Sequence, residues 1–194
     1  GFRRSPSPEV REDGGAVDVV DDVWRSLHKS SEASMPRAWL LFRAISQLDR
    51  RENVSWSVQA FKCMSFSDEA LFQSVLLMDR FYERQPPQFE VNAHDSQSKL
   101  LASVSLALKA GRRDDVEAPL RDLLTHLGNN QVPFDDVIRA ELVMLRALKY
   151  LTGTPTALDF LDAFSARLSE LVPSLANYLL HMTLFDANLH YQYP

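Results

Sequence analysis

The 194-residue sequence predicts an all-α fold, a bundle of about five helices around a buried central helix, with extra helices at the N-terminus. Three observations predict it. From Val17 onward apolar residues recur three and four positions apart, and few segments alternate as strands do. Prolines, glycines and acidic residues fall where helices should begin or end. The segment from Ser96 or Ser98 to Ala110 is apolar on nearly every side, so other helices must surround it.

Four helices and a tail are predicted before this central helix. Residues 1–16 are rich in proline, glycine and charge, which predicts a flexible tail. Residues 17–48 predict two N-terminal helices. The second is expected to begin at Pro36 and to continue to Leu48. A third helix is expected over about 50–63. A fourth is capped by Ser67 or Asp68 and stopped by a pair of prolines.

Four more helices are predicted after the central one. The first covers residues 116–127, and the second begins after Pro133 and ends near Gly153. Pro155 opens the third, and Pro173 interrupts or starts the last. The whole chain from residue 17 is therefore expected to be helical, with short connections.

Composition and missing motifs exclude several classes of function. A formal charge of −5 argues against nucleic acid as a partner. Apolar runs are too short to span a membrane and no export signal is present, so we expect an intracellular protein, nuclear or cytoplasmic. Cys63 is the only cysteine, and its apolar neighbours predict a buried, inert thiol. No motif for catalysis, a metal, a cofactor or a small-molecule substrate occurs, so none of these is expected.

Three segments resemble helices of the cyclin box. EALFQSVLLMDRF, at residues 69–81, resembles its second helix, which ends in a leucine-rich run and DRF. SKLLASVSLALKAG, at 98–111, resembles the buried third helix, and VIRAELVMLRALKYLTGTPTALDFL, at 137–161, resembles the fifth helix and its exit. Their order and spacing agree with the family, so the chain resembles a cyclin from about residue 49 to residue 194.

The ends of the resemblance imply a division into domains. DRRENVSWSVQAF (49–61) falls without gaps where cyclins carry their first helix, and is preferred over SMPRAWLLF (34–42), which would require an insertion. VPSLANYLLHMTLFDANLHYQYP resembles the opening of a second box. The resemblance thus implies a first cyclin box over 49–153, then a linker and the start of a second box over 154–194.

The family resemblance implies a regulatory subunit that binds and activates a cyclin-dependent serine/threonine protein kinase. In cyclins a lysine that ends the third helix and a glutamate of the fifth hydrogen-bond the kinase backbone, and Lys109 and Glu141 occupy those positions. The positions that match the family's apolar kinase-binding patch around the pair are Leu106, Ala110, Leu145, Tyr150 and Thr152. Of these, Ala110 stands where the family usually has an aromatic residue and Thr152 where it usually has an aliphatic one, so the patch would rest on Leu106, Leu145 and Tyr150. For Leu106 a purely core position is an equally good interpretation.

A second cyclin surface, which docks RxL-type substrate motifs, is only partly present in this sequence. The residues that remain are Trp56, Gln59 and Gln97. Polar residues replace the apolar floor, namely Asp49, Glu52, Asn53 and Ser96. Because a leucine side chain gains little on a polar surface, we expect little or no such docking.

Some interpretations stay open at this level. Ser5 and Ser7 precede prolines, which predicts proline-directed phosphorylation sites, although an unmodified linker explains these dipeptides equally well. A cyclin-fold adaptor that binds a non-kinase partner is the main functional alternative. An all-helical enzyme has no motif in its favour, and a helical-repeat scaffold lacks a recurring period. The sequence does not identify the kinase or the cellular process.

Overall fold

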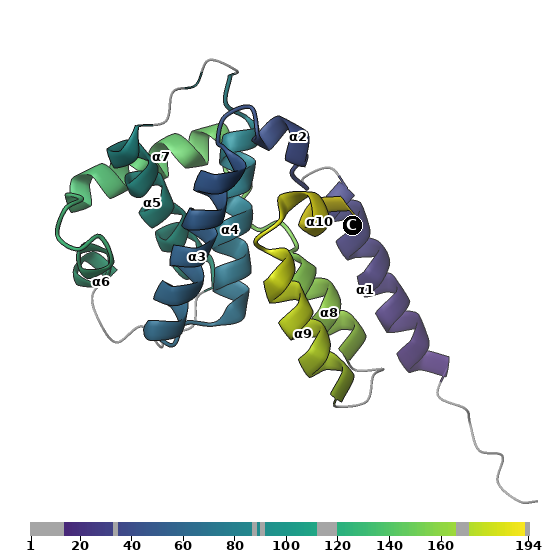
Figure 1. Ribbon diagram of the computed structural model, residues 1–194. Coiled ribbons are helices and arrows are strands. Elements are labelled where there is room, and N and C mark those ends of the chain that lie inside the picture. Colours follow the sequence, from purple (N-terminus) through teal and green to yellow (C-terminus); the bar gives the residue numbers. More distant parts are fainter. Residues whose placement is uncertain are drawn as a thin grey trace, which may run out of the picture.

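The computed structural model describes residues 14–32, 35–86, 89, 92–111, 120–165 and 171–192, which form helices and no strand (Figure 1). The all-α prediction is confirmed for this part of the chain. In order, the helices are α1 (Gly14–Glu32), α2 (Ala38–Leu41), α3 (Gln47–Cys63), α4 (Asp68–Glu83), α5 (Ala93–Gly111), α6 (Leu120–Leu127), α7 (Phe134–Ala147), α8 (Ala157–Ser165), α9 (Leu171–Thr183) and α10 (Ala187–Gln192).

Helix α5 is the buried centre of the bundle, as predicted. All residues from Leu100 to Ala107 are buried, and the helix packs against α4 on one side and α7 on another. The Ser103 hydroxyl donates to the Leu100 carbonyl at 2.8 Å and lies 3.1 Å from the Ser74 hydroxyl of α4, whereas the buried Ser105 hydroxyl has no hydrogen-bond partner in the described part of the chain. The small hydroxyl side chains of Ser74 and Ser103 therefore let α4 and α5 approach closely with both oxygens paired.

Helix α4 is the second buried helix, and its start follows the predicted cap. The Ser67 hydroxyl accepts a hydrogen bond from the Ala70 amide at 3.3 Å, with two acidic residues in the first turn. Apart from Gln73, every residue from Ala70 to Tyr82 is buried. A helix covered in this way needs neighbours on several sides, and α2, α3, α5 and α8 supply them.

Three predictions for the first third of the chain differ from the structure. The second N-terminal helix was expected to run to Leu48, but α2 ends at Leu41 and a turn follows. The reason is a cap: the Ser46 hydroxyl accepts from the Asp49 amide at 3.0 Å and starts α3 there. Cys63 is exposed at the end of α3 instead of buried. Helix α1 begins at Gly14, inside the predicted tail, and the rest of that tail, with Ser5 and Ser7, lies outside the described residues.

The C-terminal region also differs from the prediction. Helix α7 ends at Ala147 instead of near Gly153, because Lys149 and Tyr150 have φ angles of 53° and 60°, which a right-handed helix cannot contain. Helix α10 was not predicted; the Asp186 carboxylate accepts from two amides of its first turn and separates it from α9. Of the predicted helix over 116–127, the structure describes the part from residue 120.

Helix α1 packs along α8 through an aromatic cluster. The Trp24 ring lies 5.2 Å from the Phe160 ring and 4.6 Å from the Phe164 ring, measured between centroids. Figure 1 shows α1 beside α8, away from α5 and α6. Within the described ranges, no helix combines the length and the apolar character needed to cross a membrane.

A buried charge network joins the first helices of the bundle to its C-terminal end. Asp79 of α4 accepts from Arg50 Nε at 2.9 Å, from Arg50 Nη2 at 2.6 Å and from the Tyr191 hydroxyl of α10 at 2.6 Å. Arg50 Nη1 donates to the Leu184 carbonyl at 2.8 Å. Burial would lower the pKa of Arg50, but the Asp79 carboxylate more than offsets it, so that pKa is raised. Arg50 therefore stays charged and holds α3, α4 and α10 together.

Acidification is expected to weaken this C-terminal attachment through His190. Burial lowers the pKa of His190 from 6.5 to about 4, and its Nδ1 lies 2.9 Å from the Thr183 hydroxyl. The unfolded chain takes up this proton near pH 6.5, whereas the folded chain does not until about pH 4. Stability that is present above pH 6.5 is therefore lost as the pH falls.

We expect this loss to reach about 2 kcal/mol by pH 4.5, allowing for partial exposure of the ring. Urea unfolding at pH 7.0, 5.5 and 4.5 measures it, with His190→Gln as the control for all other titrating groups. The variant should lose less stability than the parent chain by that amount. Parallel curves for the two proteins would contradict the prediction.

Candidate functional site

The predicted lysine and glutamate form an ion pair on the surface between α5 and α7. Lys109 lies in the last turn of α5, and its Nζ is 2.7 Å from each carboxylate oxygen of Glu141 on α7. The Lys109 side chain is 42% exposed, whereas that of Glu141 is 9% exposed. The glutamate is thus anchored in the bundle and the ammonium faces outward. Lys109 keeps donor capacity, and Glu141 keeps lone pairs, for backbone groups of a partner.

Several apolar side chains lie on the same side of α7 as Glu141. Ile138, Leu142 and Leu145 are spaced four and three residues apart, which places them on one side of the helix. Ile138 and Leu142 are exposed at 38% and 42%, and Leu145 is half-buried. We call Lys109, Ile138, Glu141, Leu142 and Leu145 the α5–α7 surface. The sequence identified Lys109, Glu141 and Leu145 as site residues, but assigned Ile138 and Leu142 only to an apolar stripe.

The other predicted apolar anchors lie in different environments. Tyr150 is 63% exposed, so it is available to a partner. Leu106 is 7% exposed and belongs to the core, which is the alternative that the sequence left open. Leu151, which the sequence did not single out, is 60% exposed next to Tyr150. Nothing in the helical periodicity distinguishes Leu151, because its exposure depends on the turn that ends α7.

Helix α4 fixes the backbone of that turn. Arg80 Nη1 donates to the Leu151 carbonyl at 2.8 Å, Gln73 donates to the Thr152 carbonyl, and Arg84 Nη1 donates to the Ala147 carbonyl at 2.8 Å. Burial lowers the pKa of Arg80, and nearby Arg84 lowers it further. Lys149 and Tyr150 have left-handed backbone conformations, which are unfavourable for residues other than glycine. The hydrogen bonds to neighbouring carbonyls stabilise this turn, in which Tyr150 is exposed.

The remnant of the second surface is polar. Trp56 is half-buried and packs on the core, Gln59 is exposed on the same helix, and Gln97 of α5 is half-buried. Asp49 and Glu52 are exposed on α3. Asn53 and Ser96, the other two replacements, are half-buried. The surface thus carries acidic and amide groups where an apolar floor would be needed, and the loss of RxL-type docking stays a prediction.

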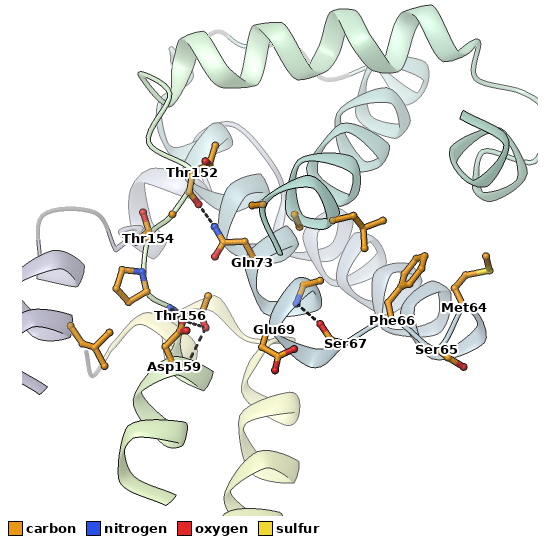
Figure 2. Close-up of a pocket in the computed structure, with 17 residues that line it drawn as sticks. Met64, Ser65, Phe66, Ser67, Glu69, Gln73, Thr152, Thr154, Thr156 and Asp159 are labelled. Carbon is orange, nitrogen blue, oxygen red and sulfur yellow. Dashed lines mark hydrogen bonds between the residues drawn. The ribbon is translucent and has the colours of Figure 1, made fainter. Parts of the chain in front are cut away.

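A pocket of about 680 Å³ lies next to the α5–α7 surface (Figure 2). Ala110 and Thr152, the two positions that depart from the family pattern, both line it. Figure 2 shows Thr152, Thr154 and Thr156 of the α7–α8 linker on one side and Phe66 on the other, with Gln73 and Glu69 between them. The sequence could not predict this pocket, because its walls come from four helices and two connections.

Comparisons with known proteins agree with the helical arrangement. The family model described as "Cyclin, N-terminal domain" matches residues 22–153. The chain is similar to G2/mitotic-specific cyclin-B2 of Rana japonica, with 27% identity over 191 residues that cover 94% of this chain and 47% of that protein. It is also similar to G2/mitotic-specific cyclin-4 of Saccharomyces cerevisiae, with 27% identity over 97% of this chain and 41% of that protein. The chain therefore spans less than half the length of these relatives.

Proposed function

The chain belongs to the cyclin family, and we therefore propose that it is a regulatory subunit that binds and activates a cyclin-dependent serine/threonine protein kinase. It would act without catalysis, cofactor or small-molecule substrate of its own, inside the cell, in the nucleus or the cytoplasm. The division into a first cyclin box over 49–153 and the start of a second box over 154–194 stays a prediction.

The observation that carries the proposal is the Lys109–Glu141 pair. Two residues that are far apart in sequence, and that the family resemblance assigns to kinase binding, lie in contact on neighbouring helices at the surface. Charge-assisted hydrogen bonds to backbone groups are strong and directional, which suits a partner segment that must be held in one conformation. Tyr150, Leu142 and Leu145 supply apolar area around the pair.

Activation would work by a shift in population. A protein kinase is active only when its lysine-to-glutamate ion pair and its metal-binding aspartate are in place, so a partner that binds this state alone favours it. Converting an almost inactive kinase into an almost fully active one requires about 5.5 kcal/mol of differential binding. An interface with a few buried anchors and a central charged pair can supply this amount.

The proposal is tested with purified kinases of the same organism. Each cyclin-dependent kinase is mixed with the 194-residue chain, and its affinity and its phosphorylation of a serine–proline peptide are measured. We expect at least one kinase to bind and to gain activity that saturates with the chain. If no kinase of the set binds, the proposal is wrong.

A cyclin-fold adaptor for a non-kinase partner is the second candidate. It is favoured by Ala110 and Thr152, which reduce the apolar area that the family presents to kinases, and by the burial of Leu106. Binding to a kinase without any gain in its activity would support an adaptor role over activation.

A further inference from the structure

Arg80 of α4 is a buried cation whose hydrogen bonds are incomplete. The residue is 0% exposed, and its Nη1 donates to the Leu151 carbonyl at 2.8 Å and to the Thr154 hydroxyl at 2.5 Å. Its Nε and Nη2 atoms have no hydrogen-bond partner in the described part of the chain, and no salt bridge joins Arg80 to a carboxylate there. Buried donors are normally paired, so this guanidinium has capacity for a further acceptor, above all an anion.

The charges around Arg80 also favour an anion. Burial lowers the pKa of Arg80, and the positive charge of Arg84 lowers it further. Glu83 raises this pKa only in part, and its carboxylate accepts from the Arg37 amide at 3.0 Å instead of pairing with Arg80. A negative group in contact with the guanidinium would compensate the charge that burial leaves unbalanced.

Thr154, which contacts this guanidinium, stands in a dipeptide that proline-directed kinases modify. The sequence contains three serine or threonine residues followed by proline, namely Ser5, Ser7 and Thr154. Figure 2 shows Thr154 on the α7–α8 linker between Thr152 and Thr156, where it lines the pocket of about 680 Å³. The residue therefore adjoins both open space and the unpaired donors of a buried arginine.

The linker has to open before a kinase can reach this threonine, because Thr154 is only 7% exposed. The left-handed backbone of Lys149 and Tyr150 makes the closed turn unfavourable by itself. Gly153 is exposed, and a Cβ atom added to it would meet no other atom within 4 Å. The hydrogen bonds from α4 side chains hold this connection closed. A strained connection of this kind opens locally at a lower cost than that of global unfolding.

We propose that Thr154 is a phosphorylation site and that Arg80 binds the phosphate. In the open linker, the Thr154 hydroxyl oxygen attacks the γ-phosphorus of ATP in a proline-directed kinase, ADP leaves, and the hydroxyl proton passes to the base of that kinase. When the linker closes, the phosphate carries a charge of about −1.5 to −2 and accepts charge-assisted hydrogen bonds from Nε and Nη2 of Arg80. Glu69 and Asp159, which line the same pocket, repel the phosphate and so favour its pairing with the arginine.

The phosphate would fix the turn that follows α7. Arg80 already holds the Leu151 carbonyl, so a phosphate on the same guanidinium ties both Leu151 and Thr154 to α4. The exposed Tyr150 and Leu151 side chains would then be presented in one backbone conformation. The inference goes beyond the proposed function, because it holds whether or not a kinase binds at the α5–α7 surface.

The first test asks whether the folded chain is modified. A chain with Ser5→Ala and Ser7→Ala, which lacks the other two proline-directed dipeptides, is incubated with ATP and a purified proline-directed kinase that phosphorylates a peptide of residues 149–158. Peptide mass spectrometry locates the phosphate. We expect it on Thr154, and we expect none in this segment when Thr154→Val is added. If that kinase modifies the peptide but leaves Thr154 of the folded chain unmodified, the site is wrong.

The second test asks whether Arg80 binds the phosphate. A phosphorus NMR titration of the modified chain measures the second pKa of the phosphothreonine, and Arg80→Gln should raise this pKa by about one unit or more. Arg51→Gln, the same change at an exposed position of α3, is the control and should leave the phosphate pKa at the parent value.

Because Arg80 is buried, its replacement can prevent folding, and the unsubstituted chain then provides the decisive measurement. The Arg80 Nε proton resonance should move downfield on phosphorylation, since that proton gains a charged acceptor. Equal phosphate pKa values in the parent and Arg80→Gln chains, or an Arg80 Nε resonance that does not move, would overturn the assignment of Arg80 to the phosphate.

Discussion

Replacing Asp79 with alanine is expected to lower the free energy of unfolding by about 3–5 kcal/mol. The carboxylate accepts two hydrogen bonds from Arg50 and one from Tyr191, and Arg50 and Asp79 are 1% and 0% exposed. Without it, a guanidinium would be buried with only the Leu184 carbonyl left to accept from it. An uncompensated buried charge is among the most costly changes that a core can undergo.

Urea unfolding of the chain, followed by circular dichroism, measures this effect. A double variant, Arg50→Met with Asp79→Leu, is the matched comparison, because it removes the charge together with its partner. Apolar residues of similar size often replace a buried ion pair at little cost, so the double variant should recover most of the lost stability. An Asp79→Ala protein within about 1 kcal/mol of the parent would show that the network contributes little.

Glu141→Ala is expected to weaken kinase binding by about 30- to 5000-fold, the range for truncating one member of a hydrogen-bonded charge pair at an interface. The variant would leave the Lys109 ammonium without its internal acceptor and remove an acceptor for the kinase backbone. Lys109→Ala should weaken binding in the same direction. Because the two side chains act as a unit, the double variant should cost less than the sum of the single ones.

Affinity for the kinase and far-ultraviolet circular dichroism must be measured on the same preparations. Helicity should be unchanged, since Lys109 is partly exposed and the pair lies at the edge of the bundle. Glu52→Ala, at an exposed position of α3, serves as the control for loss of a carboxylate. Parent-like affinity in both Lys109→Ala and Glu141→Ala would contradict the assignment of the pair to kinase binding.

The sequence predicted that nearly every long segment is helical, but it predicted few of the residues at which the helices begin or end. Apolar periodicity identified α4 and α5, because each buries a nearly complete cylinder of side chains. It failed at residues 42–46, where local capping by Ser46 overrides a continuous apolar pattern. It also failed at Cys63, because an apolar neighbourhood in sequence does not determine which side of a helix faces solvent.

The candidate site was predicted only in part, for related reasons. Family resemblance placed Lys109 and Glu141, and the structure brings their side chains into contact, although their role stays a proposal. The exposure of Leu151 depends on bonds from α4 to a distant turn, which no local pattern encodes. The pocket depends on how several elements meet, and its only signs in the sequence are Ala110 and Thr152, the two positions that depart from the family pattern.

Tyr191, near the C-terminal end of the described chain, shares one carboxylate with Arg50 of α3. A shorter fragment that stops after the α7–α8 linker would keep Arg50 and Asp79 but lose both the Leu184 carbonyl and the tyrosine hydroxyl. We therefore expect the minimal cooperative folding unit to be larger than the region that the family model covers. Hydrogen exchange should accordingly find α3, α4 and α10 opening together, as one protected block.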